Sequence, residues 1–230
     1  MKNLYLVATP IGNLKDLGFR ALEILKQVPI IICERPTHSL KILNYFGIAN
    51  KKLVSYTEAN KNHQIPFILK LLENQDAAFM VDAGTIGVSD PGSELIDKVR
   101  SQGINIISIP GPSAITSAIA LTGERIDKFL FVGFLPKKKK DLANFIEISK
   151  NNNFWLAGYE APHRLTKTLE FLAFSFPNIY VVLVSEISKI HEKVIKGKPQ
   201  EILEQFFEDP KLEKGEFVIF IKNFKLFWNR

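Results

Sequence analysis

The sequence predicts an α/β protein with two domains. Short apolar segments rich in β-branched residues alternate with segments of helical periodicity along all 230 residues. In the first half the strand-like segments are apolar throughout, which is typical of a parallel sheet covered by helices on both faces. Glycine- and proline-rich loops follow four of these segments, and such sheets bind ligands at the carboxyl ends of their strands.

In the first half, the apolar and β-branched segments predict five strands, at residues 4–8, 29–33, 52–56, 77–81 and 104–109. Helical spacing of apolar residues predicts four helices between them, at 14–28, 37–47, 65–75 and 92–103. We expect Thr37 to cap the second helix and Gly47 to end it. Pro66 is expected in the first turn of the third helix, where proline is tolerated.

The second half repeats the alternation with less regular lengths. A helix rich in small residues is expected after residue 113, at a domain boundary around Gly111–Ser113 that separates domains 1–112 and 113–230. Beyond it the pattern predicts strands at 128–136, 154–160, 179–187 and 215–222, with helices at 137–152, 162–176 and 201–209.

Composition limits the possible classes of protein. Lys and Arg outnumber Asp and Glu by 30 to 24, which suits either a polyanionic partner or an ordinary basic protein. The single cysteine, Cys33, excludes a disulfide within the chain and a zinc site built on several cysteines, and we expect it to be buried. No apolar stretch has the length of a membrane span, and Pro10 interrupts the N-terminal apolar run. We therefore expect a cytoplasmic protein.

The stretch VDAGTIGVSDPG, residues 81–92, is the most conspicuous loop. It lacks the Lys and Ser/Thr of a phosphate-binding loop and the spacing of a dinucleotide fingerprint. Its glycines would let the backbone approach a ligand closely. The alternative is a structural loop with two turns, the second at Asp90-Pro-Gly.

Several motifs resemble the tetrapyrrole methylase superfamily: LYLVATPIGNLKDL, DAGTIGVSDPG, IPGPSA, GFLPKKKK, YEAPHRL and KGEFVIFI, from Leu4 to Lys222. Within it they are most similar to the branch that methylates the 2′-hydroxyl of a cytidine in bacterial small-subunit ribosomal RNA. The resemblance implies an S-adenosyl-L-methionine-dependent methyltransferase, usually a homodimer, with two α/β domains and the cofactor in the cleft between them. It implies no metal.

The resemblance also implies positions for the cofactor. These are Ile11, Ala83, Gly84, Thr85, Val88, Ser113, Ala114, Glu160 and Ile187. An adenosyl ligand needs backbone donors and acceptors, small side chains and an apolar surface, and it carries no phosphate. The composition of these loops suits that need.

Methyl transfer to a hydroxyl needs a proton acceptor, and Glu34 matches a superfamily position with that role. A turn or ion-pair residue beside Arg35 is the alternative for Glu34, and Asp90 is the second candidate base. His38 and His163 are expected to be positioning or capping residues and not bases. Two departures from the branch are the residues 35–37, Arg-Pro-Thr in place of Asp-Thr-Arg, and Ile86 in place of proline.

Four consecutive lysines follow the motif GFLP, and we call them the lysine run: Lys137, Lys138, Lys139 and Lys140. The run is expected either to be solvated or to contact RNA phosphates, with Arg164 and Lys167 extending the same surface. Phe134 suits base stacking or a core position.

The partner we expect is ribosomal RNA or the small ribosomal subunit. Two other functions stay open. One is carbon methylation of a tetrapyrrole, and the other is a non-catalytic protein that binds RNA or senses the cofactor.

Overall fold

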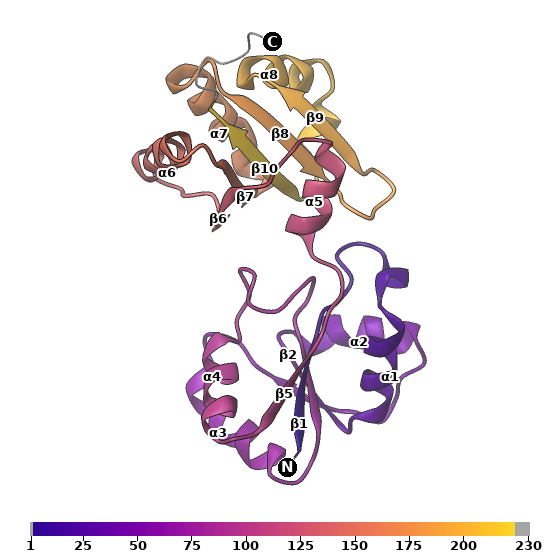
Figure 1. The fold of residues 1–230 in the computed structure, drawn as a ribbon. Coiled ribbons are helices and arrows are strands. Elements are labelled where there is room, and N and C mark those ends of the chain that lie inside the picture. The colour runs from indigo at the N-terminus through magenta and orange to yellow at the C-terminus, as the bar shows by residue number, and fades with distance from the viewer. Residues whose placement is uncertain (1, 224–230) are drawn as a thin grey trace. The chain divides into compact units, whose positions relative to one another are not determined.

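The computed structural model of the protein describes residues 2–223. The chain forms two compact units, Met1–Ser113 and Ala114–Arg230, each built on one five-stranded sheet (Figure 1). This is the α/β fold with two sheets that the sequence predicts. Among the described residues, no helix has the length and apolarity needed to span a membrane.

The first unit contains a wholly parallel sheet in the order β3-β2-β4-β1-β5. Its strands are β1 (Asn3–Val7), β2 (Ile30–Cys33), β3 (Lys52–Ser55), β4 (Ala77–Met80) and β5 (Asn105–Ile109). The inner strands β2 and β4 are buried throughout, whereas the edge strand β5 is partly exposed. The prediction of five apolar parallel strands is confirmed.

Helices cover both faces of this sheet (Figure 1). On one face, α1 (Phe19–Gln27) and α2 (Pro36–Tyr45) pack on side chains such as Val7, Ile31 and Met80. On the other, α3 (Lys61–Leu72) and α4 (Ser93–Ser101) pack on Leu4, Ile32 and Phe79. Successive side chains of each strand thus pack into the cores on opposite faces of the sheet. This explains why these strands are apolar throughout and do not alternate with polar residues. Cys33 is fully buried in the first of these cores, as expected.

Three helix boundaries in the first unit differ from the predictions. The segment 14–28 is not one helix: a 3-10 turn, η1 (Leu14–Asp16), is separated from α1 by Gly18 in an extended conformation. Thr37 is not the cap of α2, because Pro36 occupies the first helical position and Arg35 precedes it as the N-cap residue. Pro66 lies inside α3, because the helix begins earlier, at Lys61. Gly47 ends α2 with a φ of 65°, as predicted.

The second unit contains a mixed sheet in the order β6-β7-β10-β8-β9. Its strands are β6 (Phe129–Phe134), β7 (Trp155–Glu160), β8 (Tyr180–Ser185), β9 (Lys193–Gly197) and β10 (Phe217–Lys222). Only β6 and β7 are parallel. The strand β9 is not among those predicted, because its two exposed lysines and only two buried residues give a weak strand pattern.

One core forms where three helices cover the second sheet: α6 (Lys139–Asn151), α7 (Pro162–Ser175) and α8 (Pro199–Glu208). The remaining helix, α5 (Ala114–Thr122), contacts β8 and β10. A short 3-10 helix, η2 (Pro210–Glu213), precedes β10. The core draws on all three covering helices, including Ile146, Leu169 and Phe206.

The start of α6 corrects the predicted helix 137–152. Lys138 is the N-cap residue, with an extended backbone (φ −81°, ψ 123°), so the first helical residue is Lys139. Lysine has no side-chain acceptor, and Lys138 makes no capping hydrogen bond. Its carbonyl oxygen instead accepts the N–H groups of Asp141 and Leu142. The lysine run is therefore split between a loop and the first turn of the helix.

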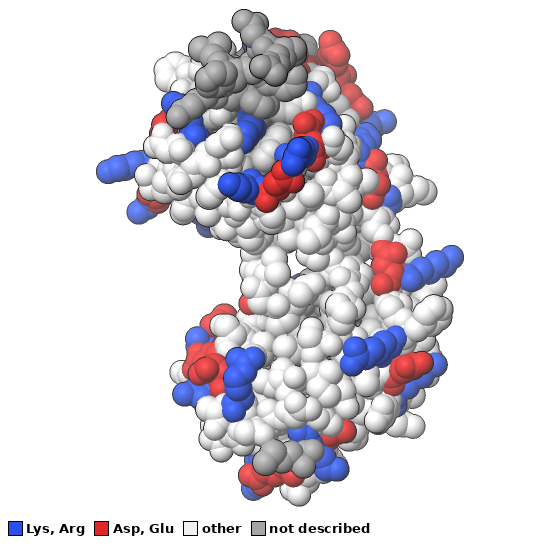
Figure 2. Space-filling model, viewed as in Figure 1, with Lys and Arg blue, Asp and Glu red and all other residues white. Residues whose placement is uncertain are grey.

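Charged side chains of both signs are interspersed on the face drawn in Figure 2. Although the net charge is +6, the lysine and arginine side chains do not form one continuous basic area on that face. Lysines or arginines clustered on one face or along one helix are the usual sign of a nucleic-acid-binding surface.

Candidate active site

The strand order brings the loops after β1 and β4 together. Thr9 and Gly84 form an isolated antiparallel bridge in which each backbone N–H donates to the carbonyl oxygen of the other, at 2.9 and 3.0 Å. The Thr9 hydroxyl, fully buried, donates to the carbonyl oxygen of Val81 at 3.0 Å. Adjacent strands whose following helices lie on opposite faces open a crevice at this edge, the usual ligand position in such sheets.

The loop after β5 lies beside the loops after β1 and β4, and we call these three loops together the platform. The Thr85 hydroxyl donates to the carbonyl oxygen of Pro112 at 3.0 Å. Gly84 has a φ of 83°, and a Cβ there would lie 3.5 Å from the side chain of Ile11. Ile11, Gly84, Thr85 and Pro112 therefore surround one small region at the carboxyl ends of β1, β4 and β5.

This region has the chemistry that an adenosyl ligand requires. Of residues 83–88, only Gly84 and Val88 donate a backbone N–H to another group in the described part of the chain. The remaining amides are available to a ligand. Ala83 is exposed, and Ile11 supplies a partly exposed apolar side chain. Backbone donors, a small side chain and an apolar flank thus occur together, which satisfies the needs of the ligand.

Three carboxylates lie on the loops beside this platform. Glu34 follows β2, while Asp82 and Asp90 come from the loop after β4. Arg35 pairs with one oxygen of Asp82, and the other oxygen, Oδ1, is buried without a partner among residues 2–223. Burial raises the pKa of Glu34, with a further increase from the negative charge of Asp82, against the opposing influence of Arg35 and His38.

Of the two predicted catalytic residues, Asp90 has the more strongly raised pKa. Burial, together with the negative charges of Glu34 and Asp82, raises the pKa of Asp90 to about 6. A carboxylate with this pKa is still mostly ionised at neutral pH but is more basic than an ordinary aspartate. Among the described residues, no group of three or more His, Cys, Asp or Glu side chains could hold a metal ion.

In the second unit, the buried Glu160 forms an ion pair with the partly exposed Arg164. The Arg164 Nε lies 3.2 Å from Glu160 Oε1, which also accepts the Ala161 N–H at 2.8 Å. Glu160 Oε2 accepts the Thr168 hydroxyl at 2.7 Å. Arg164 also donates to the carbonyl oxygens of Leu135 and Pro136, at 2.7 and 3.3 Å. These contacts hold both side chains within their own unit.

The other predicted cofactor positions lie on separate elements. Ser113 is the last residue of the first unit, and Ala114 begins α5. Ile187 lies in the loop after β8 with 9 % of its surface exposed. Val88 closes a turn in which its N–H donates to the carbonyl oxygen of Thr85 at 3.3 Å.

The lysine run surrounds the N-terminus of α6, with all four side chains exposed. Lys137 and Lys138 precede the helix, and Lys139 and Lys140 form its first turn. Cations are unfavourable there, because the N-terminus of a helix carries partial positive charge. The ammonium group of Lys139 lies 5.5 Å from the centre of the Phe171 ring, so this lysine packs on α7.

Phe134, expected to stack on a base or to lie in the core, and Arg164, expected to extend the lysine run, differ in exposure. Phe134, at the end of β6, is 57 % exposed, so it does not occupy the core. Its ring lies 5.6 Å from that of Tyr159, edge to face. The Arg164 side chain, in contrast, is only 19 % exposed and is engaged by Glu160 and two carbonyl groups. Phe134 is thus free to meet a ligand, whereas Arg164 is not an exposed cation.

Three residues that shape the platform were not singled out from the sequence: Thr9, Asp82 and Pro112. Thr9 and Pro112 lie inside motifs that were recognised, and Asp82 opens the loop after β4. Thr9 and Asp82 each directly follow an apolar strand, and this position could have marked them as candidate site residues. Their partners, however, are distant in the chain, and the sequence does not reveal them.

Comparison with known proteins agrees with this architecture. A family model described as Tetrapyrrole (Corrin/Porphyrin) Methylases matches residues 3–203. A crystal structure of diphthine synthase superimposes with a TM-score of 0.75 at 16 % identity, covering 96 % of this chain and 90 % of that one. At that level of identity the likeness concerns the fold.

Sequence relatives are more similar. "Ribosomal RNA small subunit methyltransferase I" from Halalkalibacterium halodurans is 39 % identical over 220 residues, which are 95 % of this chain and 75 % of the relative. The protein of that name from Hydrogenobaculum sp. is 36 % identical over 217 residues, 94 % of each chain.

Proposed function

The chain belongs to the tetrapyrrole (corrin/porphyrin) methylase family, and from that membership we propose that it methylates small-subunit ribosomal RNA. More narrowly, we propose that the acceptor is the 2′-hydroxyl of a cytidine ribose. The observation that carries this proposal is the similarity to relatives named for ribosomal RNA methylation along nearly the whole chain. The protein is a methyltransferase that uses S-adenosyl-L-methionine.

The platform at the carboxyl ends of β1, β4 and β5 is the proposed cofactor site in the first unit. Ile11 would contact the apolar part of the ligand, and the amides of the 83–88 loop would donate hydrogen bonds to it. When bound, S-adenosyl-L-methionine supplies a methyl group activated by a positively charged sulfur. The remaining predicted contacts are Val88, Ser113, Ala114, Glu160 and Ile187.

The carboxylates of Glu34 and Asp90 are the proposed proton acceptors. As the ribose oxygen gains the methyl group, it must lose its proton, and a nearby carboxylate can accept it. Burial and the repulsion from Asp82 make acceptance of a proton by either group more favourable than in water. Arg35 forms its ion pair with Asp82 and leaves Glu34 and Asp90 without a paired cation among the described residues.

RNA is proposed to bind through the lysine run and Phe134. Lys137, Lys138 and Lys140 would contact RNA phosphates, and such contacts fix the position of the RNA without reading its sequence. Lys139, which packs on the Phe171 ring, would also contact phosphate. Phe134 would stack on a base. The cost of placing cations at the start of α6 is offset when an anion binds there.

Arg164 is proposed to support this surface rather than to contact phosphate itself. It holds the carbonyl groups of Leu135 and Pro136, the two residues between Phe134 and the lysine run. Its ion pair with Glu160 fixes the guanidinium in place for that task.

A labelled-methyl transfer assay tests the function. Small ribosomal subunits and naked small-subunit RNA from cells lacking this protein are incubated with the protein and labelled S-adenosyl-L-methionine. We expect label in RNA, resistant to alkali at one cytidine because its 2′-oxygen is blocked. Methyl transfer to a tetrapyrrole offered in a parallel incubation, or cofactor binding with no transfer to RNA, would contradict the proposal. We also propose a homodimer, which sedimentation analysis tests.

A further inference from the structure

The second unit contains a pocket of about 300 Å³ that shares no residue with the platform or the lysine run. Two chain segments form it: one from the end of β8 to the start of β9, and the other from η2 to β10. Its lining comprises Ser185, Glu186, His191, Lys193, Lys211, Leu212, Lys214 and Gly215.

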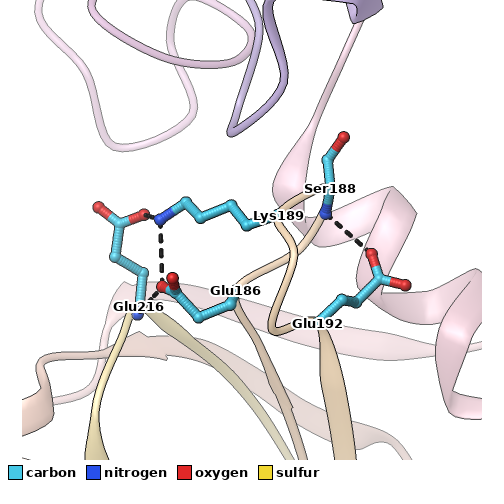
Figure 3. Close-up of polar contacts among 5 residues, drawn as sticks. All are labelled: Glu186, Ser188, Lys189, Glu192 and Glu216. Carbon is cyan, nitrogen blue, oxygen red and sulfur yellow. Dashed lines mark hydrogen bonds and ion pairs between the residues drawn. The ribbon is translucent and has the colours of Figure 1, made fainter.

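A network of polar contacts holds one wall of the pocket in place (Figure 3). Glu186 Oε1 accepts the Glu216 N–H at 3.0 Å, while the Glu186 N–H donates to the Glu216 carbonyl oxygen at 3.2 Å. Lys189 bridges the two carboxylates, at 3.1 Å from Glu186 and 2.9 Å from Glu216. In the same loop Glu192 accepts the Ser188 N–H at 2.8 Å.

Gly215 makes this wall possible. Its φ is 111°, and a Cβ at this position would lie 2.6 Å from Glu186 Cγ and Oε1. Glu186 itself has a φ of 52°, which is unfavourable for a residue with a side chain. A strained residue and a required glycine therefore hold the wall in one arrangement, which reduces the ordering cost of binding.

The pocket has an excess of positive charge. The lining lysines at positions 193, 211 and 214 are exposed, and no carboxylate within the described part of the chain pairs with any of them. Among the described lining residues the one acidic side chain is Glu186, which shares the ammonium group of Lys189 with Glu216. Three ammonium groups around one cavity, without an internal counterion, favour an anionic ligand.

The volume lies at the lower end of the range for small-molecule pockets, and Leu212 and His191 add surfaces for a sugar or base. We propose that this pocket binds a phosphate group of the RNA substrate, as an anchor separate from the lysine run. The proposal rests on the proposed function, because RNA is the polyanion that the enzyme would encounter at every turnover.

The test is the triple variant Lys193→Gln, Lys211→Gln, Lys214→Gln in the full chain. RNA affinity and methyl transfer are measured on the same samples at several salt concentrations. Each RNA phosphate that the protein neutralises contributes about 1 to the slope of log affinity against log salt, so the loss of one anchored phosphate should lower the slope by about 1. We expect the KM for RNA to rise about tenfold, because phosphate anchoring supports ground state and transition state equally.

The matched control is Lys26→Gln, Lys70→Gln, Lys98→Gln, which removes the same charge from lysines of the first unit. Its salt slope should equal that of the wild type, since these lysines anchor no phosphate. Equal slopes and equal KM in the two triple variants would overturn the pocket proposal, even with methyl transfer intact. If the wild type transfers no methyl group to RNA, the proposed function fails, and the RNA-binding slopes still decide the pocket.

A free anion is the other source of the same chemistry. Titration calorimetry with inorganic phosphate and with a short oligoribonucleotide, on wild type and pocket variant, separates the two. Loss of oligoribonucleotide binding in the pocket variant supports an RNA anchor. Loss of phosphate binding with unchanged oligoribonucleotide binding would overturn it and assign the pocket to a free anion. Unchanged cofactor affinity in the pocket variant shows that it is folded.

Discussion

At the scale of single residues, the carboxylates of the first unit carry the chemistry. Glu34, Asp82 and Asp90 come from two separate loops, yet burial and the charge of Asp82 raise the pKa of both other groups. Arg35 forms its ion pair with Asp82, and together with His38 it offsets only part of the rise in the pKa of Glu34, while no cation among the described residues opposes the rise in the pKa of Asp90. Resemblance singled out Glu34, but the raised pKa values depend on burial and on neighbours that no local pattern specifies.

Turnover should separate the two candidate bases. Glu34→Gln and Asp90→Asn each keep the shape of the side chain but remove its ability to accept a proton. We expect the variant that removes the true base to have a kcat about 10²- to 10⁴-fold lower, with unchanged cofactor affinity. Measurement of kcat and cofactor affinity for both variants checks this. Full turnover in both variants would eliminate the carboxylate mechanism.

Asp90 should also make stability depend on pH. Its folded pKa of about 6 exceeds the ordinary value of 3.8, so the folded state binds more protons between these values, and stability falls as pH rises through that window. Asp90→Asn should therefore stabilise the protein at pH 7.5 by about 1 kcal/mol, a figure reduced for the partial exposure of the group. Chemical denaturation at pH 7.5 and at about pH 4 measures it, and the gain should largely disappear at the lower pH.

At the scale of elements, the strand order decides which loops meet. Placing β1 between β4 and β5 brings Thr9 against Gly84 and Thr85 against Pro112. The sequence showed that glycine- and proline-rich loops follow the strands. It could not show which of them are neighbours, because these hydrogen bonds join residues far apart in the chain.

Gly84→Ala should weaken cofactor binding. The positive φ costs an alanine roughly 1 to 2 kcal/mol, and the relaxation would disturb the bridge to Thr9. Gly103→Ala is the control, since Gly103 has a φ of 70° with open space around it, just beyond α4. Both variants should lose similar stability in denaturant melts. Only Gly84→Ala should lose cofactor affinity by calorimetry, and equal affinities would show that the bridge does not shape the site.

At the scale of the whole molecule, two local clusters of lysine contribute to the excess of positive charge. The exposed lysine run and the pocket around Lys193, Lys211 and Lys214 lie on different elements of the second unit. Resemblance pointed to the first cluster because its lysines are consecutive. The second was invisible in the sequence, since its lysines come from two segments brought together by the pairing of β8 with β9 and β10.

Neutralising the lysine run should weaken RNA binding without destabilising the fold. Glutamine at positions 137 to 140 removes four cations from around the helix start, where they are unfavourable, so thermal stability should stay equal or rise slightly. RNA affinity should fall, and the salt slope should decrease by about 1 for each lysine that contacts phosphate. Thermal melts and RNA binding at several salt concentrations check both parts, and an unchanged slope would show that the run is merely solvated.

The sequence was sufficient for the alternation of strands and helices, for the loops that follow the strands and for the family. These depend on periodicity, on Gly and Pro, and on motifs of a few residues, all of which are local in the chain. Tertiary structure was needed for the order of the strands, for the raised pKa of Asp90, for the pairing of Arg164 with Glu160 and for the basic pocket. Each of these arises from burial or from the proximity of particular groups in the folded chain. Such proximity is created by folding and leaves no short-range pattern in the sequence.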